Sequence, residues 1–202
     1  SGIRPLFGYT IHMISKKTLI ALPNEHLRQP SAKVGIVTSE IKQIISNMKK
    51  TTLEWEKTRD HEVGVALAAI QIDVPLKILI IRADIEDKDN KNFDVFINAE
   101  IIKKEGEIIE DYEGCLSIKD IYGKVPRYNK VKIKALDENG NPFRVTADGF
   151  LARIFQHEID HTKGTLFIDH IKNDPSAFFK LDKDGKLLEQ NYDEINKNHI
   201  LW

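Results

Sequence analysis

The sequence predicts an α+β fold with a mostly antiparallel sheet, because a series of strand-like segments lies between two helical ones. Apolar residues at helical spacing and an acidic first turn predict the first helix over about 38–58. The second helix is expected to begin after Asp148 as the N-cap and to end at Gly164. Between the helices, the turn Asp137–Gly140 separates two strand-like segments and predicts a hairpin.

The strands themselves are expected in short apolar segments between these helices, at 77–81, 93–98, 101–109, 131–136 and 143–146. The segment from Gly64 to Gln71 consists of small and apolar residues, which indicates close packing or close approach of a ligand. Near the end of the chain, Lys183-Asp184-Gly185 predicts a further turn between two apolar pairs.

Charge and composition exclude several classes of function. The net charge is -1, so no overall field attracts nucleic acid or an anionic membrane, and direct nucleic-acid binding is not expected. The longest apolar run, Val65 to Ile70, is far shorter than the roughly 20 residues that span a bilayer. The single cysteine, Cys115, cannot form an internal disulfide, which indicates a reducing compartment such as the cytoplasm. Because residues 1–24 contain no acidic residue, an organelle matrix or stroma is the alternative location.

The second predicted helix carries the clearest chemical pattern, His157-Glu158-Ile159-Asp160-His161. An arc of about 60° on its apolar side contains Phe150, Ile154, His157 and His161. The polar side contains Arg153, Gln156, Asp160 and Lys163. Two imidazoles and the Glu158 carboxylate therefore turn inward, which is costly unless they find a partner. A divalent cation would satisfy all three groups, and the alternative is a hydrogen-bonded pair of core histidines beside a surface glutamate.

A catalytic metal usually has three protein ligands and one open position, so two histidines need a third ligand. Some proteases supply a third histidine downstream, but that position is occupied by Phe167 although Gly164 matches. The sequence offers Cys115 instead, directly after Gly114, which allows the backbone to approach closely. The alternative for a lone cysteine is a small apolar residue of the core.

Three motifs in order resemble the peptide deformylases, which remove formate from the N-formylmethionine of new polypeptides. These motifs are Gly64–Gln71, Glu113–Ser117 and Gln156–His161. The resemblance covers about residues 18–172, and it implies mostly antiparallel sheets packed around a central metal-binding helix. Two positions depart from the family pattern, which commonly has glycine at Ala66 and proline at Ile70.

The resemblance also implies the roles of individual residues. Cys115, His157 and His161 would bind the metal, which is ferrous iron in the working enzyme, with zinc, nickel or cobalt as substitutes. Glu158 would act as general base and then general acid, since a bound water has its pKa lowered and can give up a proton. The remaining implied site residues are Gln71 and the Leu116 N–H in an oxyanion hole, and Val65, Ala66, Gly114 and Ile154 at the substrate.

The expected organisation is an N-terminal arm at 1–17, a deformylase-like catalytic domain at 18–172 and a C-terminal extension at 173–202 without an assigned role. The expected partners are N-formylmethionyl nascent peptides near the ribosome. Two other functions are consistent with the same motifs: a metallopeptidase that cleaves internal peptide bonds, and a silent metal-binding module that contacts ribosomes or nascent chains.

Overall fold

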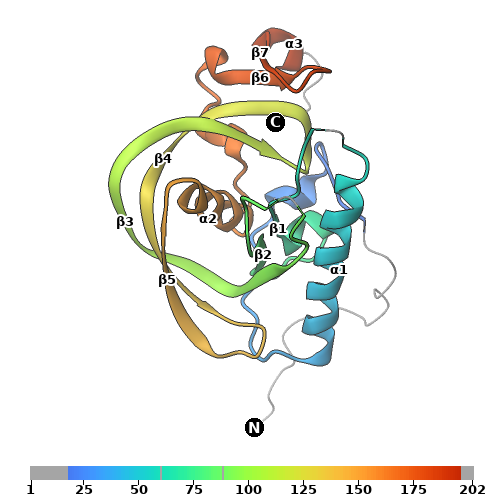
Figure 1. The fold of residues 1–202 in the computed structure, drawn as a ribbon, viewed down its shortest axis with the longest axis vertical. Helices are drawn as coiled ribbons and strands as arrows, with labels where there is room; N and C mark the ends of the chain where they lie inside the picture. The colour runs from blue at the N-terminus through green and yellow to red at the C-terminus, as the bar shows by residue number, and fades with distance from the viewer. Residues whose placement is uncertain (1–17, 60, 88, 197–202) are drawn as a thin grey trace.

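A computed structural model describes residues 18–59, 61–87 and 89–196, so the expected arm at 1–17 lies outside the described residues. Its strands form one sheet in the order β1-β2-β3-β4-β6-β7, with β5 on β4 (Figure 1). The strands are β1 (Ala66–Ala68), β2 (Ile78–Arg82), β3 (Phe93–Cys115), β4 (Ile118–Leu136), β5 (Pro142–Asp148), β6 (Phe178–Leu181) and β7 (Leu187–Glu189). All the pairings between these strands are antiparallel, which confirms the predicted fold class.

Within the described residues, three α-helices accompany the sheet: α1 (Ser39–Glu56), α2 (Gly149–His161) and α3 (Tyr192–Asn196). Short 3-10 helices lie at Glu25–Arg28, Ala69–Ile72, Phe167–His170 and Pro175–Ala177. No helix in the described ranges is long and apolar enough to cross a membrane.

The two long helices pack on opposite faces of β1 and β2. Leu79 and Ile81 of β2 face the core around α2, whereas Ile78 and Ile80 face the core around α1. Because both faces are covered, every residue of β2 is buried. This arrangement places α2 at the centre of the molecule.

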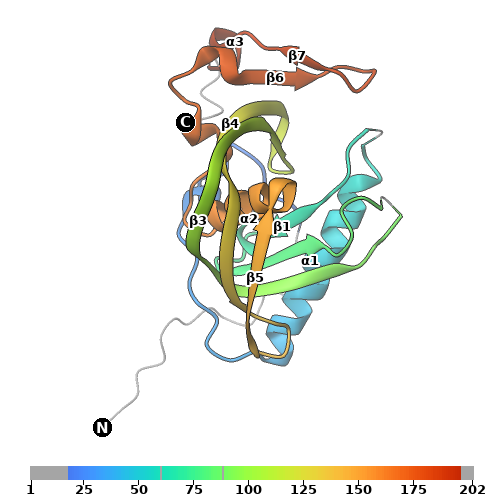
Figure 2. The same ribbon diagram turned by 60° about the vertical axis from the view of Figure 1, so that its left-hand side comes forward.

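The strands expected at 93–98 and 101–109 are a single strand, β3, which continues to Cys115. It pairs with β4 along most of its length, and this long pair curves around α2 (Figures 1 and 2). The register shifts at four places along the pair, and such irregularities allow a strand pair to bend. The far end of β3 therefore reaches back to α2 and delivers Cys115 there.

The helix α2 begins directly after Asp148, as predicted, and it ends slightly before the predicted Gly164. Asp148 is at the N-cap position, but its side chain makes no capping hydrogen bond. The helix ends at His161 and not at Gly164, which lies beyond the last turn with a φ of +74°. A Cβ at Gly164 would collide with the Arg28 carbonyl, so glycine is needed here for a close chain crossing.

Two of the four residues predicted on the polar side of α2 are buried, because β3 and β4 cover them. Arg153 and Gln156 are 6% and 3% exposed, whereas Phe150, expected on the buried side, is 52% exposed. The Gln156 amide bonds the Tyr128 backbone in both directions, at 2.8 and 3.2 Å. Arg153 donates to the Val125 carbonyl of β4 at 2.7 Å. Polar residues that find partners on a strand can thus be buried like apolar ones.

The chain beyond residue 173 extends the same sheet. Strand β6 pairs with β4 at Tyr122 and Gly123, and β7 folds back on β6. The turn predicted at Lys183-Asp184-Gly185 joins these two strands, which confirms it. Phe178 is fully buried and fixes β6 against the body of the molecule.

Candidate metal centre

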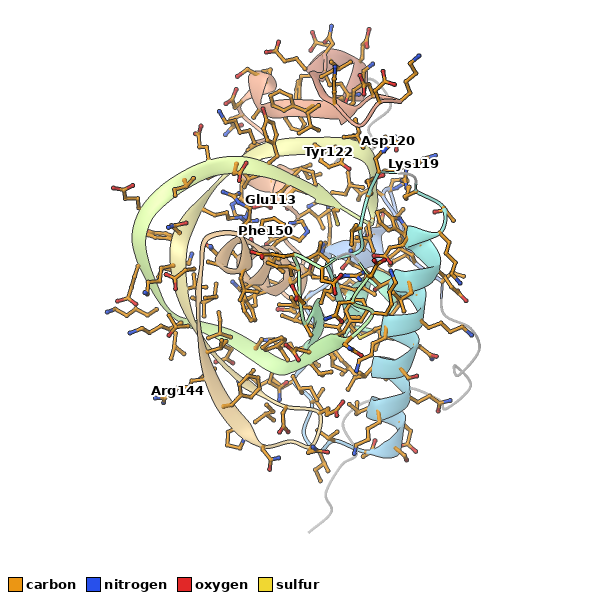
Figure 3. The ribbon with its side chains drawn as sticks, viewed as in Figure 1. Glu113, Lys119, Asp120, Tyr122, Arg144 and Phe150 are labelled. Carbon is orange, nitrogen blue, oxygen red and sulfur yellow. The ribbon has the colours of Figure 1, made fainter. Side chains whose placement is uncertain are left out.

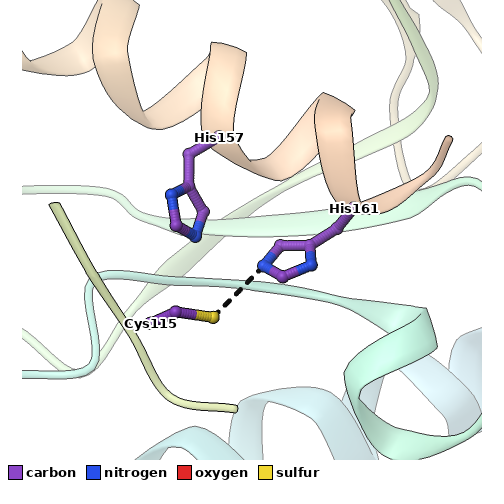
Figure 4. A group of neighbouring side chains, drawn as sticks. All are labelled: Cys115, His157 and His161. Atoms are coloured by element: carbon purple, nitrogen blue, oxygen red, sulfur yellow. Dashed lines mark hydrogen bonds between the residues drawn. The ribbon is translucent and has the colours of Figure 1, made fainter. Parts of the chain in front are cut away.

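Cys115 at the end of β3 meets both histidines of the α2 motif (Figure 4). The Sγ atom of Cys115 lies 3.3 Å from Nε2 of His161. One ligand atom from each of Cys115, His157 and His161 can be chosen so that all three lie within 4.8 Å of one another. Cys115 and the two histidines therefore form one group, although Cys115 lies 42 residues or more from the histidines in the chain.

This group fits a divalent transition metal. Metal bonds of 2.0–2.3 Å in a tetrahedral arrangement separate neighbouring ligand atoms by about 3.3–3.6 Å. The Cys115–His161 separation of 3.3 Å is already close to that value. A thiolate and two imidazoles are donors that iron, zinc, nickel and cobalt all accept. The three residues therefore form a metal-binding group whose donors do not select one of these metals.

Glu113 determines which nitrogen of His157 faces the metal-binding group. Its carboxylate lies 2.9 Å from Nδ1 of His157, and a carboxylate can only accept, so Nδ1 donates. The Nε2 lone pair is then left for a metal. Sequence reasoning placed Glu113 in a motif but gave it no role, although a carboxylate two residues before the candidate thiol is a signal of an orienting group.

Two arginines fix Glu113 in turn. Arg127 donates to both carboxylate oxygens, at 2.9 and 3.1 Å, and Arg153 donates to one of them at 2.9 Å. Burial raises the pKa of Glu113, but the hydrogen bonds from His157 and Arg127 outweigh it and hold the pKa at about 2. Glu113 is therefore a permanent anion at neutral pH.

The two imidazoles have opposite pKa shifts. Burial lowers the pKa of His157, but its contacts with Cys115 and Glu113 outweigh burial and raise it well above the usual value. The pKa of His161 is lowered, first by burial and then by the charge of His157. His161 is thus held in the neutral form that a metal ligand requires.

Glu158 is buried beside these ligands and forms no ion pair with another described residue. It is 5% exposed, and its Oε2 has no hydrogen-bond partner among the described residues. Burial raises its pKa to about 7, although the charge of His157 acts in the opposite direction. A carboxyl group in this state can accept a proton or give one up near neutral pH.

The Gln71 side chain is held with its amide nitrogen toward Cys115. Its Oε1 accepts a hydrogen bond from the Ala68 N–H at 2.8 Å, which fixes the orientation of the amide. Its Nε2 donates to Ser117 Oγ at 3.1 Å and lies 3.4 Å from Cys115 Sγ. A hydrogen-bond donor is therefore fixed next to the metal-binding group.

A cavity of about 380 Å³ opens over this group. Every site residue predicted from the sequence lines it except His161, which is 1% exposed. Ala66, at a position where glycine is common, lies in β1 without a positive φ, so alanine is not strained there. Gly114 is needed for a different reason, because a Cβ would collide with the Tyr122 ring.

Other residues of the cavity carried no sequence signal, because they come from segments outside the three motifs. They include Trp55, His61, Glu62, Leu181 and Leu187. Tyr122 lies at the start of β4 and donates to Glu62 at 2.5 Å (Figure 3). A second cavity of about 410 Å³, beside Glu100 and Lys163, contains none of the predicted site residues.

Comparison with known proteins gives one consistent result. The sequence profile of the family described as polypeptide deformylase matches residues 16–176. A peptide deformylase from Aquifex aeolicus (strain VF5) is 40% identical over 156 residues, covering 77% of this chain and 88% of the relative.

Solved structures agree with the sequence comparison. A peptide deformylase from Synechococcus elongatus in complex with actinonin has a TM-score of 0.69 and 36% identity, covering 79% of this chain and 86% of that one. The enzyme from Legionella pneumophila has a TM-score of 0.67 and 38% identity, covering 76% and 85%. The chain therefore belongs to the peptide deformylase family, metal-dependent hydrolases that remove the N-terminal formyl group.

Proposed function

We propose that this chain releases formate from N-formylmethionine at the N-terminus of newly made polypeptides, with Glu158 as the proton-transfer group. The observation that carries this proposal is a Cys-His-His metal-binding group in one open cavity with a buried carboxylate, one oxygen of which has no hydrogen-bond partner among the described residues. A metal bound by Cys115, His157 and His161 would supply Lewis acidity, lowering the pKa of a water and polarising the formyl oxygen.

Glu158 performs two proton transfers in this proposal. It accepts a proton from the water whose oxygen adds to the formyl carbon, and it then donates that proton to the departing amine. The C–N bond breaks with its electron pair going to the amine, and the remaining acidic proton of the product passes to the amine or to water as formate leaves, so protons and electrons balance. This proton-transfer role is supported by the burial of Glu158 on the cavity wall next to His157.

Gln71 and the Leu116 backbone N–H stabilise the negative charge that develops on the formyl oxygen. The support for Gln71 is the fixed direction of its amide nitrogen toward Cys115. Leu116 follows Cys115 directly and lines the same cavity. A neutral amide suits this task, because it donates a hydrogen bond without adding a further charge to the site.

We assign the working metal as ferrous iron, with zinc, nickel or cobalt as substitutes. Oxygen can attack an iron–thiolate site, and oxidation of Cys115 would remove a ligand. Activity of the iron form is therefore expected to decay in air, while nickel or cobalt forms persist. Reconstituting metal-free protein with each ion under nitrogen and then admitting air tests this, and equal air-stable activity with zinc and iron would refute it.

The catalytic unit is assigned to residues 18–172. Val65, Ala66, Gly114 and Ile154 border the methionine and the first peptide unit, which their position on the cavity wall supports. The substrate is a nascent chain near the ribosome. The unpaired Cys115 thiol favours reducing conditions, and we assign the enzyme to the cytoplasm.

An anaerobic assay of formate release from a formyl-Met-Ala-Ser peptide tests the function, with metal content measured on the same sample. We expect stoichiometric metal and one formate per peptide. The matched control is acetyl-Met-Ala-Ser, which presents a bulkier acyl group. Cleavage of an internal bond would indicate a metallopeptidase, and bound metal without turnover would indicate a silent module.

A further inference from the structure

The hairpin formed by β6 and β7 is one wall of the cavity that holds the metal-binding group. Leu181, Gly185 and Leu187 line this cavity together with Cys115 and Glu158. These hairpin residues follow residue 176, where the match to the family profile ends. The cavity therefore has a wall that the three motifs do not encode.

Two contacts fix the base of the hairpin. The buried side chain of Phe178 packs into the core beside β4, and its ring lies 5.1 Å from that of Tyr192. The ring of Phe179 meets Tyr112 edge-to-face, with centroids 4.9 Å apart. Since Tyr112 also lines the cavity, the position of β6 is set relative to the cavity mouth.

The tip of the hairpin is fixed from the other side. His61, on the segment after α1, donates through Nε2 to the Lys183 carbonyl at 3.2 Å. Gly185 has a φ of +77°, and a Cβ there would lie 3.3 Å from the His61 ring. In Figure 2 the hairpin lies beyond the curved end of the β3–β4 pair, where β6 adds to β4 in the same sheet. The hairpin tip is therefore held against the segment after α1, and both the tip and this segment border the cavity.

The hairpin presents an apolar face to the cavity. Leu181 and Leu187 are cross-strand partners, so their side chains lie on the same face, and both line the cavity. Lys180 and Leu188 are the next pair and lie on the opposite face, where Leu188 is 44% exposed. Phe150, 52% exposed at the start of α2, also lines the cavity.

We propose that Leu181 and Leu187 bind an apolar side chain that follows the formylmethionine and make the enzyme select substrates by that residue. The inference rests on the proposed function, because it requires the formyl group to lie at the metal-binding group. The rest of the peptide must then leave through the cavity mouth, past this wall. An apolar side chain that loses water there gains binding energy that a hydroxyl side chain does not.

The test compares kcat/KM for formyl-Met-Leu-Ser with that for formyl-Met-Ser-Ser. The wild-type ratio is expected to be about 10-fold or more, since small apolar differences in a pocket change kcat/KM by about 10- to 200-fold. The double variant Leu181→Ser/Leu187→Ser should reduce this ratio to within about threefold of unity. Leu188→Ser is the matched control on the opposite face, and its ratio should equal the wild-type ratio.

Two further readouts separate this role from a structural one. The metal content of the double variant should stay at the wild-type value, and its kcat/KM for formyl-Met amide, which has no following residue, should fall far less than that for formyl-Met-Leu-Ser. If the double variant melts at a lower temperature, Leu187→Ala replaces it, and the ratio should still fall several-fold. An unchanged ratio in a folded variant would overturn the inference while formate release continues. Absence of formate from every peptide would instead overturn the proposed function, on which the inference depends.

Discussion

Two glutamates near His157 have the same burial and different chemistry. Glu113 and Glu158 are each 5% exposed. Glu113 accepts hydrogen bonds from Arg127, Arg153 and His157, and its pKa is about 2. Glu158 has an oxygen without a partner, and burial raises its pKa to about 7. Partners, and not burial, therefore decide which carboxyl group is a fixed anion.

The difference separates two tasks within one site. A group that must orient a ligand is best held in one charge state by several hydrogen bonds. A group that must accept and return a proton needs a pKa near the working pH. Glu113 fits the first description and Glu158 the second. The following substitutions test this separation, from the largest expected effect to the smallest.

Replacing the carboxyl group that lacks a partner should have the largest effect. Glu158→Gln keeps the size of the side chain and removes its base, so kcat should fall by about 10²- to 10⁴-fold. Formate release and metal content are measured on one preparation, with the exposed Glu110→Gln as control. Loss of metal from Glu158→Gln would show that this residue is a ligand and not a base.

Replacing Gln71, the neutral hydrogen-bond donor beside Cys115, should have the second largest effect. Gln71→Ala removes one donor to the developing oxyanion, and kcat is expected to fall by about 10²- to 10³-fold. Metal content should stay near the wild-type value, because Gln71 only donates toward Cys115. Steady-state kinetics decide between roles, and a change confined to KM would contradict the oxyanion assignment.

Glu113→Gln should weaken metal binding while leaving the proton-transfer group in place. Loss of the charge that orients His157 is expected to lower metal affinity by about 10- to 100-fold. Competition with a chelator measures the affinity, and turnover per bound metal should change far less than in Glu158→Gln. A variant with unchanged affinity and lost turnover would reverse the roles assigned to the two glutamates.

The same substitution has a pH signature in the metal-free protein. The pKa of Glu113 is about 2 in the folded state and 4.5 in its ordinary state. A lowered pKa adds stability above pH 4.5, and this stability is lost as the pH falls toward 2. The difference in unfolding free energy between wild type and Glu113→Gln should therefore shrink over that interval, as denaturant titrations at several pH values can measure.

Replacing a third glutamate, Glu100, should have the smallest effect. Glu100 also lies between two cations, Lys33 at 2.7 Å and Lys134 at 2.8 Å, and hydrogen bonds first from Lys134 and then from Lys33 lower its pKa to about 2. Its side chain is 30% exposed, so water and salt screen the pairs. Glu100→Gln should cost at most about 1 kcal/mol of stability, less at high salt. A larger loss of stability would mean that the greater exposure of Glu100 does not make its ion pairs weaker than those of Glu113.

Local sequence patterns determined the α+β fold class, the hairpins and the identity of the metal-binding residues. Four-residue spacing on a helix places His157 and His161 one turn apart whatever surrounds the helix, and the turn signals act over a few residues. The family motifs added Cys115 and the cavity residues around it. The helix, the turns and the spacing of the two histidines depend on short-range geometry, so the sequence alone is sufficient for them, whereas Cys115 was identified by its resemblance to a known motif.

Only the tertiary structure decided which partners each buried group obtained. Helical periodicity gives directions around the axis of α2, but it does not show that β3 and β4 cover its polar side and bury Arg153 and Gln156. The pairing of Glu113 with His157, 44 residues away, depends on the curvature of the β3–β4 pair. The C-terminal hairpin reaches the cavity because β6 adds to β4. Contacts between distant segments follow from how elements pack, and no local pattern encodes them.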